Sequence, residues 1–185
     1  MNRFDKASLL VALTEKLRAS GSWAGETHIQ KAMYILETVL GVPAGFEFIL
    51  YKHGPFSFDL RDELGSLRTD GFIDWELKSE RYRPSLKPGA LSDALKKQFP
   101  TIPERYSREI DFVASRLGNK NVAELERLAT AIYVTKDEEI ERDARAARIN
   151  ELKGHVSLPE AEAAVGDADG LIADAKAQFA NVMAA

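Results

Sequence analysis

Few residues of this chain could do chemistry. It has no cysteine and three histidines, His28, His53 and His155, which stand far apart in the sequence. Thiol catalysis and cysteine-ligated metal sites are therefore excluded, and three scattered histidines lack the spacing of a metal site. The sequence also contains no glycine-rich phosphate loop and no recognisable Ser–His–Asp motif. We therefore expect a protein that acts by binding, with no catalytic residue, no metal and no cofactor.

His53 belongs to the turn with the clearest pattern, Tyr51-Lys52-His53-Gly54-Pro55. In a functional interpretation, His53 would be an acid–base group or a ligand. In a structural interpretation, Gly54 supplies an unusual backbone angle and Pro55 sets the direction of the following helix. We favour the structural interpretation, because no nucleophile or carboxylate pair has a recognisable spacing from His53.

A second polar group, Gln30, Lys31 and Tyr34, lies on one side of a predicted helix. These side chains would form either a polar site that faces the Gly54-Pro55 turn or a semi-buried network. We favour the network, in which the stems of Lys31 and Tyr34 pack while their polar tips stay at the surface.

The elements expected around these residues follow from the spacing of apolar residues and from capping and turn residues. In the first half they are helices over 4–19 and 26–40, a strand over 46–50, a helix opened by Ser57, and a hairpin over 73–86. This order is typical of a winged helix-turn-helix domain, which we expect over residues 1–89. Residues 90–185 are expected to be a helical extension that packs on that domain or dimerises with it. Its expected helices cover 90–99, 104–117, 122–134 and 137–152, followed by a last helical region capped by Ser157. The predicted fold class is mainly α with a small β-hairpin.

Four segments carry a family resemblance: IQKAMYILE (29–37), FILYKHGPFSFDL (48–60), LRTDGFI (67–73) and ELERLATAIYV (124–134). They resemble the YwgA-like family of small bacterial winged-helix proteins and, more distantly, the Panacea antitoxin domain. Both typically show a "QK-x-x-Y" helix followed by a "Y-x-x-GP" turn, and relatives often have Lys-Pro where this chain has Lys153-Gly154. The matching positions here are Gln30, Lys31, Tyr34, Tyr51, Gly54 and Pro55. The resemblance implies a winged-helix scaffold of regulators, antitoxins or mobile-element accessory proteins.

In such a scaffold, cations on the helix opened by Ser57 and on the hairpin would contact nucleic acid. The candidates are Arg61, Arg68, Lys78, Arg81, Arg83 and Lys87. Acidic residues on the same helix, such as Asp59 and Asp62, would repel a phosphate backbone, so this face could equally bind a protein. The hairpin could likewise be an edge protected by charge against pairing with another strand.

The charge distribution bears on this choice. Residues 1–100 hold 14 Lys and Arg against 13 Asp and Glu, and residues 101–185 hold 11 against 16. DNA-binding proteins usually show a clear basic excess. Two hypotheses therefore stand: a regulator of double-stranded DNA that forms a homodimer, or an antitoxin-like, phage-defence or mobile-element protein whose partner is a protein such as a toxin. We choose DNA as the target. Without a signal peptide or an apolar stretch of membrane length, we expect a cytoplasmic protein.

Overall fold

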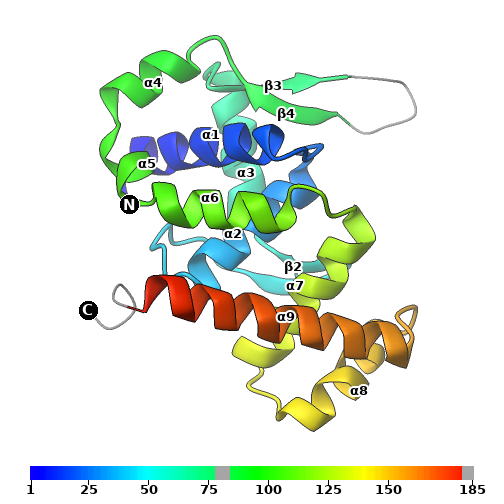
Figure 1. Ribbon diagram of the computed structural model, residues 1–185. Coiled ribbons are helices and arrows are strands. Elements are labelled where there is room, and N and C mark those ends of the chain that lie inside the picture. The colour runs from blue at the N-terminus through cyan, green and yellow to red at the C-terminus, as the bar shows by residue number, and fades with distance from the viewer. Residues whose placement is uncertain (78–83, 181–185) are drawn as a thin grey trace.

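The computed structural model describes residues 1–77 and 84–180 and is mainly helical, with two small antiparallel hairpins (Figure 1). This confirms the predicted class, mainly α with a small β component. The described elements are, in order, α1 (Arg3–Ala19), α2 (Glu26–Thr38), β1 (Ile49–Tyr51), β2 (Gly54–Phe56), α3 (Phe58–Thr69), β3 (Ile73–Glu76), β4 (Ser85–Pro88), α4 (Ser92–Gln98), α5 (Thr101–Arg105), α6 (Ser107–Leu117), α7 (Val122–Lys136), α8 (Arg142–Leu152) and α9 (Leu158–Phe179).

Helices α1 and α2 form the centre of the hydrophobic core. Leu9, Leu10, Leu13 and Leu17 of α1 have no exposed surface, and every residue from 28 to 36 in α2 is buried. A helix that is buried on all sides must have partners on all sides. Helix α1 packs on α4, α5, α6 and β4, while α2 packs on α6 and α7, so helices from both halves of the chain share one core.

The first hairpin differs from the predicted strand over 46–50. Strand β1 begins only at Ile49 and pairs with β2, so that Tyr51 faces Gly54. Residues 46–48 of the predicted strand lie outside β1. Glu37 Oε1 accepts hydrogen bonds from the N–H groups of Gly45 and Phe46. The half-buried Glu37 carboxylate therefore takes the N–H group of Phe46, a donor that a strand partner would have used.

Helix α3 follows the prediction for its start. The hydroxyl of Ser57 accepts a hydrogen bond from Leu60 N at 3.2 Å, which caps the helix. Leu60, Leu64 and Leu67 turn into the core, and the rest of the helix surface is mostly exposed. Gly71, with φ of +76°, then directs the chain into β3.

The second hairpin pairs β3 with β4 from Ile73 opposite Pro88 to Glu76 opposite Ser85. Its predicted tip and the start of its predicted return strand, residues 78–83, lie outside the described residues. Pro88 sits at the end of a two-stranded ladder, a position where a missing N–H is tolerated.

The C-terminal helices also depart from the prediction at particular points. The expected helix over 104–117 is divided at Tyr106 into α5 and α6. The expected helix over 137–152 begins only at Arg142, because Glu139 adopts φ of +52°, which an α-helix cannot contain. Helices α8 and α9 pack on each other and on α7, at the end of the molecule opposite the β3–β4 hairpin (Figure 1). Within the described ranges, no helix has the length and hydropathy needed to cross a membrane.

Candidate functional site

The polar group of α2 holds the start of α3 in place. The Gln30 amide donates to Ser57 O and accepts from Ser57 N, both at 2.9 Å, and Gln30 and Ser57 are both fully buried. Lys31 Nζ donates to Pro55 O at 2.7 Å. Gln30 therefore binds the backbone of Ser57, which links β2 to α3, and Lys31 binds the backbone of β2 itself.

The expectation that Lys31 and Tyr34 keep their polar tips at the surface is wrong. Lys31 is 1% exposed and Tyr34 is fully buried. Each polar atom has a partner in the protein: Lys31 Nζ donates to Pro55 O, and the Tyr34 hydroxyl donates to the carboxylate of Asp137, an exposed residue at the end of α7. Burial lowers the pKa of Lys31 to about 8. Burial and the neighbouring Asp137 raise the pKa of Tyr34 above its ordinary value.

Gly54 allows the β1–β2 turn to lie directly on α7. Its φ is +84°, the positive angle that the sequence suggests for this glycine. A Cβ atom at this position would stand 3.2 Å from Thr130 Oγ1 and 3.4 Å from the carbonyl oxygen of Glu126. The glycine is therefore required both by the backbone angle and by the closeness of α7.

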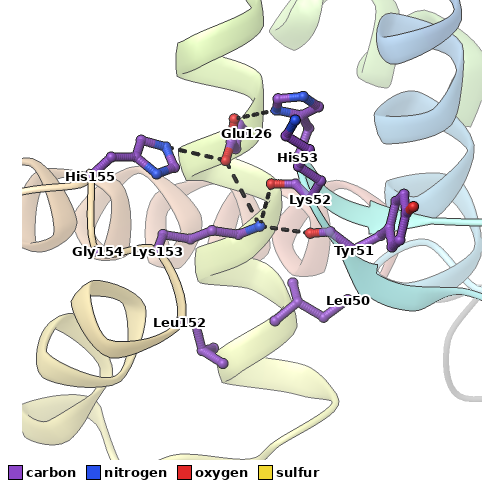
Figure 2. Close-up of a pocket in the computed structure, with 9 residues that line it drawn as sticks. All are labelled: Leu50, Tyr51, Lys52, His53, Glu126, Leu152, Lys153, Gly154 and His155. Atoms are coloured by element: carbon purple, nitrogen blue, oxygen red, sulfur yellow. Dashed lines mark hydrogen bonds and ion pairs between the residues drawn. The ribbon is translucent and has the colours of Figure 1, made fainter.

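Beside this turn, α7 presents a buried carboxylate to three basic side chains (Figure 2). Glu126 Oε2 lies 3.2 Å from His53 Nδ1, and Oε1 lies 3.4 Å from His155 Nε2 and 3.8 Å from Lys153 Nζ. The Glu126 side chain is 8% exposed, whereas the side chains of His53 and His155 are 59% and 66% exposed. These residues line a cavity of about 490 Å³, with Leu50 and Leu152 as its apolar wall.

Lys153 connects two distant segments of the chain within this cluster. Its ammonium group donates to Tyr51 O at 2.6 Å and to Lys52 O at 2.7 Å (Figure 2). It thus ties the segment between α8 and α9 to the β1–β2 turn, and burial lowers its pKa. An ammonium beside Glu126 would repel a metal cation. In the described part of the chain, no three metal-ligating side chains are arranged to hold a metal ion.

His53 lies in a turn, as predicted, but the partners of its side chain could not be predicted from the sequence. His53 is 73 residues from Glu126, and Lys153 is more than 100 residues from Tyr51. Sequence motifs and helical spacing relate residues that are much closer in the chain, so they could not predict these contacts. The available signal was the family resemblance, which covered residues 124–134 and Lys153-Gly154 without assigning them a role. The third histidine, His28, lies apart from this cluster, with Nε2 at 3.0 Å from Lys120 O, and burial lowers its pKa.

A larger hollow, which we call the α3 groove, has a volume of about 950 Å³. It lies between α3, the β3–β4 hairpin, the β1–β2 turn, the start of α2 and the link from α6 to α7. Its lining includes cationic and aromatic side chains: Lys52, Arg61, Arg68, Lys120, Trp23, Tyr51, Phe56 and Trp75. Glu26 is the only residue with a carboxylate among the described residues that line the groove.

Two of the predicted nucleic-acid contacts, Arg61 and Arg68, meet in this groove. The Arg68 guanidinium lies 4.0 Å from the centre of the Trp75 ring, and that of Arg61 lies 5.1 Å from the Phe58 ring. Arg61 also donates to Asp62 Oδ1 from Nε at 2.9 Å and from Nη2 at 2.8 Å.

The other predicted contacts do not join them. Lys87 is on β4 and does not line the groove. Lys78, Arg81 and Arg83 lie outside the described residues. Two other lysines, Lys52 and Lys120, line the groove and were not among the predicted contacts.

No protein-family model matches this chain, and no curated protein matches it. The resemblance to the YwgA-like and Panacea proteins stays a prediction.

Proposed function

We propose that this chain is a cytoplasmic winged-helix regulatory protein that acts by binding DNA. The observation that carries the proposal is the basic and aromatic α3 groove, in a protein whose formal net charge is −4. Cations that gather on one surface of an acidic protein indicate an anionic ligand for that surface. The succession of α1, α2, the β1–β2 hairpin, α3 and the β3–β4 hairpin supports the winged helix-turn-helix of this proposal.

In this proposal, Arg61 and Arg68 of α3 bind phosphates or base edges. Both are exposed, and neither is held by a buried partner. Lys87, together with Lys78, Arg81 and Arg83, which lie outside the described residues, would add contacts. The C-terminal helices would dimerise.

The test is fluorescence anisotropy of a labelled mixed-sequence duplex, titrated with protein at low and moderate salt. An Arg61→Ala/Arg68→Ala variant should bind at least ten-fold more weakly. Its slope of log affinity against log salt should fall by about 2, since each phosphate contact contributes about 0.9.

A matched control is Arg105→Ala/Arg108→Ala. These arginines are also exposed and also stack on aromatic rings, those of Tyr106 and Phe179, away from the groove. The control removes the same charge and should bind like the unmodified protein. The proposal fails if no DNA binds even at low salt, or if both double variants lose affinity equally.

A protein partner is the second candidate, and a specific observation favours it. Tyr51, Phe56 and Phe58 form a ring cluster with centroids 5.1–5.8 Å apart, and Tyr51 and Phe58 are 53% and 40% exposed. Exposed aromatic clusters are frequent centres of protein interfaces. For an antitoxin-like or defence protein, Tyr51→Ala/Phe58→Ala should abolish co-purification of an identified partner. Retention of that partner by the variant would exclude this cluster as the interface.

A further inference from the structure

We propose that the α3 groove binds a short single-stranded stretch of nucleic acid in preference to a duplex. This inference rests on the proposed function, because it names the form of nucleic acid that the same surface takes.

The position of the α3 cations supports a single strand. Arg61, Gly65 and Arg68 recur at helical spacing and line the groove, between the β3–β4 hairpin and the link from α6 to α7. A recognition helix must instead project into the major groove of a duplex, which is about 12 Å wide. The exposed residues of α3 that do not line the groove include Asp59, Asp62 and Ser66. A duplex approaching α3 would meet the carboxylates of Asp59 and Asp62, whereas a single strand could enter the groove.

Aromatic faces in the groove can receive unstacked bases. Trp75 is 52% exposed and Tyr51 is 53% exposed, so about half of each side chain is open to solvent. Arg68 stacks on Trp75 at 4.0 Å, so a cation and a ring are available together. A positively charged groove with aromatic rings is the general design of single-strand binding, because every base has a face that can stack.

Phosphates can replace the weak ion-pair partners that the cations of the groove have in this structure. The Lys52 ammonium makes no ion pair with any described residue. Lys120 has a pair with Asp167 at 3.6 Å, and Arg61 is paired with Asp62; both carboxylates are exposed, at 63% and 69% of their side chains. Exposed pairs of this kind are weak and exchange readily with another anion. In addition, α2 begins at this groove. Its N-cap residue, Gly25, lines the groove and has no side chain to bind the first N–H groups of the helix.

The test compares three labelled 12-mers at one salt concentration: oligothymidine, oligouridine and a mixed-sequence DNA duplex. We expect the single strands to bind at least ten-fold more tightly than the duplex. The two single strands distinguish DNA from RNA as the source of the strand.

A groove-filling variant, Gly65→Leu, tests the location without changing charge. A Cβ atom at Gly65 meets no other atom within 4 Å, and leucine favours a helix more than glycine does. We expect it to fold and to lose at least ten-fold in single-strand affinity. The control is Ser66→Leu, one residue further along α3 and outside the groove lining, which should bind like the unmodified protein.

Each outcome decides the question. Duplex binding as tight as single-strand binding, or full single-strand binding by Gly65→Leu, would overturn this inference and leave the proposed DNA-binding function standing. If no nucleic acid of either form binds at low salt, both proposals fall.

Discussion

Two pairs of cations in this protein have opposite surroundings. Lys31 and Lys153 are 1% and 6% exposed, and their ammonium groups donate to backbone carbonyls of residues 51, 52 and 55. Arg61 and Arg68 are exposed and lie over the rings of Phe58 and Trp75. Both lysines are satisfied by backbone carbonyls of the protein, although Lys31 also borders the α3 groove, whereas the arginines are exposed in that groove.

The contrast shows why residue type alone does not identify a binding site. A buried ammonium must be satisfied by the protein itself, since an unpaired charge inside a protein is very unfavourable. Such a group is committed to the fold and is not available to a ligand. An exposed guanidinium on an aromatic ring keeps most of its donors free, so it can bind a phosphate without disturbing the core. The comparison predicts that the lysines control stability and the arginines control binding.

The largest expected effect is that of Lys153→Met. The substitution removes the donor of two backbone carbonyls and leaves Glu126 with one cationic neighbour fewer. We expect the free energy of unfolding to fall by about 3 kcal/mol, in the range for breaking a buried hydrogen-bonded charge. Urea denaturation monitored by circular dichroism measures it. Lys97→Met, at an exposed position of α4, is the control and should change stability by less than about 0.5 kcal/mol.

A second prediction concerns Lys31 and pH. In the folded protein its pKa is about 8, against 10.5 for an ordinary lysine. Between these values the unfolded chain binds the proton and the folded protein does not, so stability rises with pH. From about pH 7.5 to 9.5, Lys31 should contribute an increase of about 2 kcal/mol in the free energy of unfolding.

The variant Lys31→Met isolates this contribution. The unmodified protein also contains Lys153, whose lowered pKa acts in the same direction, so the difference between the two pH profiles is the quantity to compare. Tyr34, with its raised pKa, would oppose the trend at higher pH, which is why the comparison stops near pH 9.5. Parallel profiles of the two proteins would show that Lys31 keeps its ordinary pKa and is not desolvated.

The local parts of the fold could be predicted from the sequence. The Ser57 cap, the apolar positions of α3 and the turn at Gly54 all depend on interactions within a few residues, and each was found in the structure. Arg61 and Arg68 were also found on one surface, because their spacing of seven residues places them on one face of any helix.

The remaining features depend on contacts between distant segments. Glu126 meets His53, His155 and Lys153 only after α7 packs on the β1–β2 turn. Glu37 binds the backbone N–H groups of Gly45 and Phe46, ahead of β1, and strand propensity does not describe such a contact. Lys52 and Lys120 join the groove from two different loops, so helical spacing could not select them.

A third prediction compares two glycines. Gly54 lies in the β1–β2 turn that the buried lysines hold, and Gly65 lies on α3 between the two exposed arginines. Gly54→Ala would force alanine to φ of +84° and bring its Cβ to 3.2 Å from Thr130 Oγ1. We expect a loss of about 1–2 kcal/mol, the usual penalty for a side chain in the left-handed region. Gly65→Ala, in a helix with open space around it, should instead stabilise the protein by about 0.5–1 kcal/mol. Thermal unfolding of both variants measures the signs, and a destabilising Gly65→Ala would mean that α3 is packed more tightly than the groove allows.

The smallest expected effect on stability is that of Arg68→Ala. Arg68 loses one cation–π contact at an exposed site, which is about 0.5–1 kcal/mol, and the substitution gains alanine's helix propensity in return. The free energy of unfolding should therefore change by less than about 0.5 kcal/mol. Denaturation of Arg68→Ala beside Lys153→Met tests the two halves of the comparison in one experiment. If Arg68→Ala destabilised the protein as much as Lys153→Met, Arg68 would be a structural residue, and weakened DNA binding by its variants could no longer be read as a lost contact. If stability is unchanged and binding is lost, Arg68 acts on the ligand itself.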